Sequence, residues 1–218
     1  MDGDVKTSAV PVYPASVEAR IDDIIAFWLG TASDKPSDVI RRWFTKDTLF
    51  DDEIRSRFGD DLEIASRGGY DAWAHGDARS VLAYVILTDQ LTRNAFRDSG
   101  RAFALDEKAL VASLDAQSRG IDTSLGFLER YVLYLPMMHA EDKEVQARCV
   151  SVFATLASDA SKAGEDEIAG MLRGAHDYAV RHQVIVERFG RFPHRNSLLD
   201  RTSTPDEAMF LLEPGAGF

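Results

Sequence analysis

Apolar residues recur at intervals of three and four along almost the whole chain, and no stretch shows the strict alternation of a half-buried β-strand. The first helical segment starts at Ser16, ends at Gly30 and has an apolar face made of Ile21, Ile24, Ile25 and Trp28. The same spacing predicts helices over residues 36–44, 47–67, 79–96, 106–119, 124–135, 141–162, 165–189 and 204–212. Connections of only a few residues favour antiparallel neighbours, so we predict an all-α fold, either a helical bundle or an array of αα-hairpins.

The length of the chain, 218 residues, suits one compact domain or two small ones. Residues 1–15 contain Pro11 and Pro14 and little periodic pattern, which predicts a flexible N-terminal arm. The helical pattern then continues without a linker, so we expect residues 16–218 to form a single α-helical domain. Within the segment 47–67 we expect the helix to be interrupted or bent near Gly59.

Charge and cysteine content exclude several classes of function. Lys and Arg number 25 and Asp and Glu number 36, and the net charge of −11 argues against binding to nucleic acid or to an anionic membrane surface. Cys149 is the single cysteine, which excludes an intramolecular disulfide and a thiolate metal cluster and fits a reducing compartment. No apolar run is long enough to span a membrane. We therefore expect a cytoplasmic protein.

Charged residues occupy positions on the apolar stripes of two predicted helices. In the segment 79–96, Asp89 and Arg93 continue the stripe that Leu82 and Ile86 begin. In the segment 165–189, His182 shares a face with aliphatic residues, and in the segment 124–135 Glu129 lies on the apolar side. Burying a charge costs several kcal/mol unless it is paired, so we expect such residues to contact one another.

The densest cationic cluster is the string from Arg188 to Asn196, RFGRFPHRN, which places three arginines and a histidine beyond a helix end in an acidic chain. Arginine side chains suit a carboxylate or phosphate ligand. Alternatively, these cations cap helix carbonyls and pair with acidic residues of the chain, namely Asp89, Glu129, Glu141 or Asp142.

Four stretches carry a resemblance to a known family: RWFxKDxxFD from Arg42, DQxxRN from Asp89, YxPxMHxED from Tyr134 and the RFGRFPHRN string, followed by RxSTP from Arg201. Together they closely resemble the bacterial DUF924 family over nearly the whole chain after the arm. The resemblance implies a compact, tetratricopeptide-like α-helical fold and no established family-wide activity. Ala140 stands where the family usually has serine, Thr92 where it has proline and Asp200 where it has glycine, and the missing serine argues against a serine hydrolase.

The resemblance also identifies the polar positions that fall on the family's motifs. Those that we expect to take part in proton transfer are His139, Glu141, Asp142 and His182. Those that we expect to bind a ligand are Asp89, Gln90, Arg93, Asn94, Arg188, Arg191, His194, Arg195 and Asn196.

Two hypotheses of function follow, and the residues leave open whether the chain is an enzyme. In the first, Arg93, Arg191 and Arg195 hold a small anionic ligand while a histidine beside Glu141 or Asp142 transfers a proton. A metal variant would use imidazole and carboxylate ligands, but the spacing is unsuitable and the neighbouring arginines disfavour a cation, so we predict no metal site. The sequence points to no particular cofactor.

In the second hypothesis, the helices form an interaction module for a protein partner and the polar motifs are a structural network. A polar cluster that solvent can reach would favour a ligand site, whereas a sealed one would favour the structural network.

Overall fold

The computed structural model describes residues 16–31 and 33–216, and the predicted arm, residues 1–15, lies outside the described residues. The helices in this part of the chain are α1 (Val17–Leu29), α2 (Pro36–Phe44), α3 (Thr48–Ser66), α4 (Ala78–Val85), α5 (Thr92–Ala95), α6 (Asp106–Ser118), α7 (Phe127–His139), α8 (Lys143–Lys162), α9 (Asp166–Phe189) and α10 (Pro205–Phe210). Four 3₁₀ turns, η1 (Asp71–His75), η3 (Gly100–Phe103), η4 (Ile121–Ser124) and η5 (Pro193–Leu199), and one π-helical segment, η2 (Ile86–Leu91), complete the regular structure of the described residues. No strand occurs among them, so the all-α prediction is confirmed.

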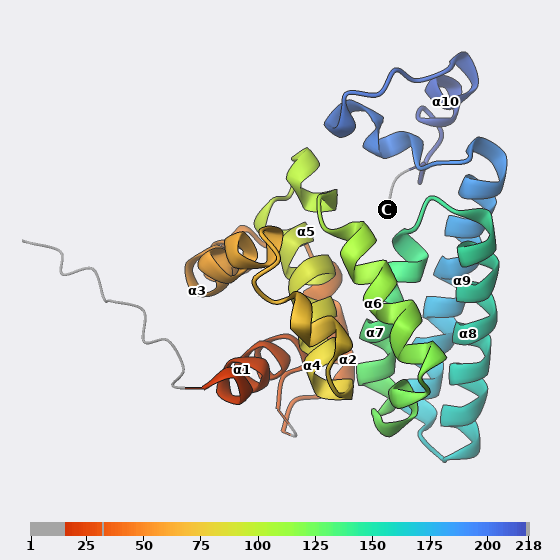
Figure 1. Cartoon of the computed structure of the whole chain (residues 1–218). Helices are drawn as coiled ribbons and strands as arrows, with labels where there is room; N and C mark the ends of the chain where they lie inside the picture. Colours follow the sequence, from red (N-terminus) through yellow and green to blue (C-terminus); the bar gives the residue numbers. More distant parts are fainter. Residues whose placement is uncertain (1–15, 32, 217–218) are drawn as a thin grey trace, which may run out of the picture.

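Helices α6, α7, α8 and α9 lie side by side, each in contact with the next along the chain (Figure 1). The two longest, α8 and α9, form a hairpin on one side, and α7 and α6 follow in the next positions. The continuous run of α4, η2 and α5 lies at the centre, with α1 and α3 on its far side. This arrangement is compatible with the tetratricopeptide-like fold that the sequence resemblance implies.

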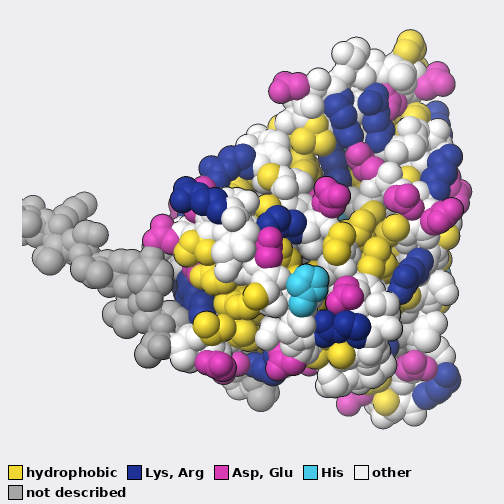
Figure 2. Space-filling view, viewed as in Figure 1, with side chains coloured by type: hydrophobic (Ala, Val, Ile, Leu, Met, Phe, Trp, Pro, Cys, Tyr) yellow, Lys and Arg dark blue, Asp and Glu magenta, His cyan; other side chains and the backbone are white. Residues whose placement is uncertain are grey.

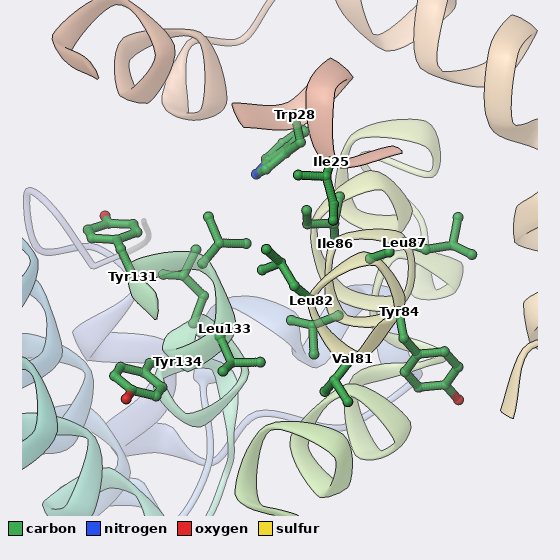
Figure 3. Close-up of a cluster of buried hydrophobic side chains, with 14 of the residues drawn as sticks. Ile25, Trp28, Val81, Leu82, Tyr84, Ile86, Leu87, Tyr131, Leu133 and Tyr134 are labelled. Atoms are coloured by element: carbon green, nitrogen blue, oxygen red, sulfur yellow. The ribbon is translucent and has the colours of Figure 1, made fainter. Parts of the chain in front are cut away.

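The main apolar core lies around α4 and η2, where α1 and α7 contribute side chains from either side (Figure 3). Ile25 and Trp28 enter it from α1, Leu82 from α4 and Tyr131 from α7. All four apolar positions predicted for the first helix are buried. Among the described residues no helix is both long and apolar enough to cross a membrane.

The structure differs from the predicted elements at two helices. The segment predicted as one helix over residues 79–96 is divided by the π-helical turn η2. Helix α7 starts at Phe127 and continues past Pro136 to His139, beyond its predicted end at residue 135. The extension is stabilised by the Gln146 side chain, whose amide donates to the carbonyls of Met138 and Ala140 at 2.8 and 2.7 Å. In addition, α3 runs through Gly59 without interruption.

The chain reverses at Gly190, which ends α9 in the left-handed conformation (φ 72°), as its position after the helical pattern predicts. The residues that follow, 190–216, are called here the C-terminal segment, and they lie across the upper end of α8 and α9 in Figure 1. A small apolar cluster of its own, separate from the main core, joins Phe192 to Ile185 and Val186 of α9. The end of α9 and the C-terminal segment therefore share a second, smaller core.

Candidate functional site

Five polar side chains from different elements meet beneath the C-terminal segment, and we call them the polar cluster. They are Asp89 of η2, Arg93 of α5, Asp106 at the start of α6, His139 at the end of α7 and Arg195 of η5. Figure 2 shows Lys and Arg side chains on this upper part of the molecule, with acidic side chains close to them.

The shortest contact among the five side chains of the polar cluster joins His139 to Asp89, with 2.7 Å between Nδ1 and Oδ1. Burial opposes ionisation of Asp89, but the charges of His139 and Arg93 and the hydrogen bonds from His139 and Gln90 hold the pKa of this carboxyl below its usual range. Nδ1 of His139 faces two groups, Asp89 Oδ1 at 2.7 Å and the Nε–H of Arg93 at 3.2 Å. We assign the proton to Nδ1, because the nearer group is an ionised carboxylate that can only accept, and Nε2 then carries no proton in the neutral ring. The Gln90 amide donates to the other oxygen of Asp89.

Arg93 joins the two carboxylates of the polar cluster. Its Nη2 donates to Asp106 at 2.9 Å and to Asp89 at 3.2 Å. Burial and the charge of Arg93 lower the pKa of His139 against the opposing effect of Asp89, so the imidazole is neutral at pH 7. Burial, together with the charge of Asp89, raises the pKa of Asp106 although both arginines of the polar cluster oppose the shift.

Asp89 lies in the π-helical segment η2, all of whose residues are buried. A π-helical turn holds one residue more than an α-helical turn and changes the direction of the side chains that follow, and such turns are frequent at functional sites. Here Thr92 Oγ1 donates to the carbonyl of Leu87, five residues earlier. The apolar spacing of the sequence gives no sign of this turn.

The polar cluster is partly open to solvent. Asp89 is fully buried, whereas the side chains of His139, Arg93 and Asp106 keep 16%, 20% and 20% of their exposure. Two surface cavities, of about 580 Å³ between α8 and α9 and about 290 Å³ beside the start of α4, lie elsewhere and are not lined by the polar cluster. Solvent therefore reaches three of the five side chains of the polar cluster.

The carboxylate beside His139 is Asp89, and neither Glu141 nor Asp142 pairs with it as the sequence suggested. Glu141 forms a bidentate ion pair with Arg201, at 2.6 and 2.9 Å, and accepts from the Phe192 amide at 2.8 Å. Burial opposes its ionisation, but the hydrogen bonds from Arg201 and Phe192 lower the pKa of Glu141. Asp142 caps the start of α8 by accepting from the Val145 amide at 2.9 Å.

Several other predicted ligand residues have partners within the chain. Arg191 binds Glu207 at 2.6 and 2.8 Å. Asn196 donates to Ser203 at 3.0 Å. Arg188 is exposed and stacks on Phe189 and Phe210.

Asn94 belongs to a second polar group, in which it and Arg97 donate to the buried Asp51 at 2.7 to 2.9 Å. This contact links α3 to the end of α5. The DQxxRN motif therefore contributes to two separate polar groups, one around Asp89 and one around Asp51.

Two further predicted histidines lie next to Phe192 at the edge of the polar cluster. His182 is buried, its Nδ1 is 2.8 Å from the carbonyl oxygen of Tyr178, and its ring meets Phe192 edge-on at 5.4 Å. The His194 ring lies 5.7 Å from that of Phe192. Burial and nearby positive charge lower the pKa of His182 to about 3 and that of His194 to about 4. Among the described residues, no three His, Cys, Asp or Glu side chains are arranged to hold a metal ion.

Sequence reasoning missed Asp106 and the pairing role of Arg201. Asp106 resembles an ordinary acidic residue of a helix N-terminus, where a negative charge is favourable in any case. Arg201 closes a family motif, but nothing in its local sequence indicates that its partner is Glu141, sixty residues earlier.

Fold and site together define an all-α protein in which an Asp–Arg–His cluster lies under the C-terminal segment. Residues 24–215 match the family of bacterial proteins of unknown function DUF924, and the chain belongs to this family. It is similar to a solved protein of unknown function from Agrobacterium tumefaciens, with 36% identity and a TM-score of 0.74, over 91% of this chain and 100% of that one. Comparison with curated proteins found no match.

Proposed function

We propose that the Asp89–His139 pair transfers a proton to or from a small anionic ligand bound at the polar cluster. The observation that carries the proposal is the 2.7 Å contact between a fully buried carboxylate and a histidine whose side chain is still 16% exposed. A buried carboxylate that fixes the tautomer of a reachable histidine is the arrangement used in general acid–base catalysis.

The protonation state of His139 supports the role of a base. A neutral ring with Nδ1–H directed at Asp89 has its lone pair on Nε2, the atom that would take the proton. After proton uptake, the negative charge of Asp89 stabilises the imidazolium. The lowered pKa of His139 keeps the ring in the basic form at neutral pH.

The charges around the pair favour an anionic ligand over a cation. Arg93 is paired with Asp89 and Asp106, whereas the guanidinium of Arg195 makes one side-chain hydrogen bond within the described residues, to Asp106 at 3.3 Å. Arg195 is therefore the cation that favours an anion here, in a chain whose net charge is −11. A cytoplasmic location is part of the same proposal, supported by the single and buried Cys149. The proposal involves no nucleic acid and no membrane surface.

The test combines turnover with the state of His139. The substrates are chromogenic phosphate monoesters and chromogenic esters that carry a carboxylate. In hydrolysis, His139 would take a proton from the attacking water while the bond to the chromophore breaks and the chromophore leaves. We expect wild type to hydrolyse one class and His139→Gln or Asp89→Asn to lower kcat by roughly 10²- to 10⁴-fold. By ¹⁵N NMR, His139 of wild type should be the neutral Nδ1–H tautomer at pH 7.

His176→Gln is the matched control, because His176 lies on α9 outside the polar cluster and its side chain is 32% exposed. The proton-transfer proposal is wrong if His139 is a doubly protonated imidazolium at pH 7. It is also wrong if the His139 and Asp89 variants turn over substrate as fast as wild type does. In that case the polar cluster is a structural network, and a protein partner for the helical surface becomes the hypothesis to test.

A further inference from the structure

We infer that the C-terminal segment closes over the polar cluster and presents Arg195 as the contact for an oxyanion of the ligand, a carboxylate or a phosphoryl group. The inference rests on the proposed function, because it places the anionic ligand of that same site. It adds which side chain binds the ligand and which part of the chain moves to admit it.

The guanidinium of Arg195 is buried and uses few of its hydrogen-bond donors within the described residues. The residue is 5% exposed, and its guanidinium packs against the rings of Phe103 and Phe192, 4.8 and 4.5 Å from their centroids. Within the described residues its side chain makes one hydrogen bond, from Nη1 to Asp106 at 3.3 Å, and its buried Nε has no hydrogen-bond partner. Buried polar groups are usually hydrogen-bonded, so we expect a buried donor of a charged group that has no partner in the chain to bind an acceptor from a ligand.

The unmatched atom lies on the edge of the guanidinium that suits an oxyanion. Nε and the adjacent Nη2 donate in parallel, and a carboxylate or phosphate can accept from both at once. Burial and the charge of Arg93 lower the pKa of Arg195 to about 10, which indicates that the negative charge nearby does not fully compensate it.

The other arginines of the region are better matched. Arg191 and Arg201 each form a bidentate pair with a glutamate, at 2.6 to 2.9 Å. The buried Nε of Arg201 also lacks a hydrogen-bond partner, but both of its terminal nitrogens donate to Glu141. Arg93 contacts two aspartates. Their charges are therefore engaged within the chain, and Arg195 is the better candidate to bind a ligand.

The C-terminal segment is attached to the body through contacts that can separate without exposing the main core. Its apolar cluster around Phe192 is distinct from that core. The Glu141–Arg201 ion pair fixes it to the connection between α7 and α8, and the Arg195–Asp106 contact fixes it to α6. Because Nε of Arg195 is shielded from solvent in this arrangement, an oxyanion reaches it when the segment moves away and is enclosed when it returns.

Gly100 lets the segment approach closely. A Cβ atom at this position would lie 2.5 Å from the carbonyl oxygen of Leu198, closer than any real Cβ contact. Substitution by alanine would therefore push η5 away from η3 without changing any charged group. This position offers a test of closure that leaves Arg195 itself intact.

The binding experiment uses isothermal titration calorimetry on the full chain with inorganic phosphate and malonate as separate probes, and uncharged malonamide as the reference. We expect wild type to bind at least one of the two anions and not malonamide. Arg195→Met should weaken binding by roughly 10- to 100-fold, since it removes charge-assisted hydrogen bonds. Arg195→Lys should also weaken it, because lysine keeps the charge but loses the paired donors.

Two matched controls separate the effect from general loss of charge or stability. Arg181→Met removes an exposed arginine of α9, and Gly174→Ala adds a methyl group where nothing lies within 4 Å. Both should bind as wild type does, whereas Gly100→Ala should weaken binding. Circular dichroism shows which variants are folded. If Arg195→Met does not fold, the comparison with wild type uses Arg195→Lys instead.

The outcomes distinguish this inference from the proposed function. If neither anion binds wild type, or if both Arg195 variants bind as tightly as wild type, the inference is overturned even if His139 transfers protons. If Arg195 variants lose the anion while His139→Gln retains it and no turnover is found, Arg195 is the oxyanion contact and the proton-transfer role fails. Binding of phosphate alone or malonate alone identifies the ligand group as phosphoryl or carboxylate.

Discussion

At the scale of single residues, His182 shows how burial converts a titratable group into a pH-dependent element of stability. Its side chain lies on the core face of α9, and burial there opposes the charged form. The folded protein therefore takes up a proton on this ring at about pH 3, whereas the unfolded chain does so near pH 6.5. The neutral ring favours the folded state above pH 6.5, and this contribution falls as the pH decreases toward 3.

Replacing His182 should therefore flatten the acid side of the stability curve. In wild type, as the pH is lowered from 6 to 4, protonation of His182 in the unfolded chain lowers the free energy of unfolding by up to about 1.4 kcal/mol for each pH unit. His182→Gln should lose that slope, as measured by urea unfolding at several pH values, while His176→Gln keeps it. An unchanged slope in His182→Gln would show that His182 is not held neutral by burial.

At the scale of elements, the attachment of the C-terminal segment depends on Glu141, which lies in the connection between α7 and α8 and pairs with Arg201. This carboxylate accepts from both terminal nitrogens of Arg201 and from the backbone of Phe192. Hydrogen bonds to a charged group are stronger than those between neutral groups. We therefore expect the contacts of Glu141 to provide much of the free energy that holds the C-terminal segment against the helices.

Glu141→Gln should loosen the C-terminal segment without unfolding the helices below it. Loss of a charged pair of this kind is worth about 1 to 3 kcal/mol, so amide hydrogen exchange over residues 193–210 should accelerate by roughly 10- to 100-fold. Exchange within α8 should not change. The control is Glu144→Gln, an exposed acid in the first turn of α8. Equal exchange in Glu141→Gln and wild type would mean that the segment is held mainly by its apolar contacts.

At the scale of the whole molecule, the described residues contain two apolar clusters of very different size. The three tryptophans, Trp28, Trp43 and Trp73, all belong to the larger one, so their fluorescence reports on that core. Phe153 is fully buried there and packs edge-on against Tyr131 and Tyr134.

Phe153→Ala should lower the free energy of unfolding, followed by tryptophan fluorescence in urea, by about 3 to 5 kcal/mol because it leaves a cavity in the main core. Phe210→Ala, in the smaller cluster, should lower it by no more than about 1 kcal/mol. If both variants lose the same amount, the two clusters unfold as a single cooperative unit.

Much of the fold was predictable because helical periodicity is a local property. The spacing of apolar residues located the helices, and the stripes placed Asp89 and His182 in buried positions, as the structure confirms. The family motifs also contain four of the five residues of the polar cluster. Asp106 escaped notice because an acid at the start of a helix has an ordinary local explanation.

The partners of these residues were decided by tertiary structure alone. His139 meets Asp89 across 50 positions of the sequence and Arg195 meets Asp106 across 89, so no spacing within one helix could reveal either contact. The π-helical turn at Asp89 and the exposure that remains at His139 likewise depend on how the helices pack. The sequence by itself determined where the helices form and which faces are buried, since those depend on neighbours within about four residues. Which charges meet, and which stay open to a ligand, depended on packing between distant segments.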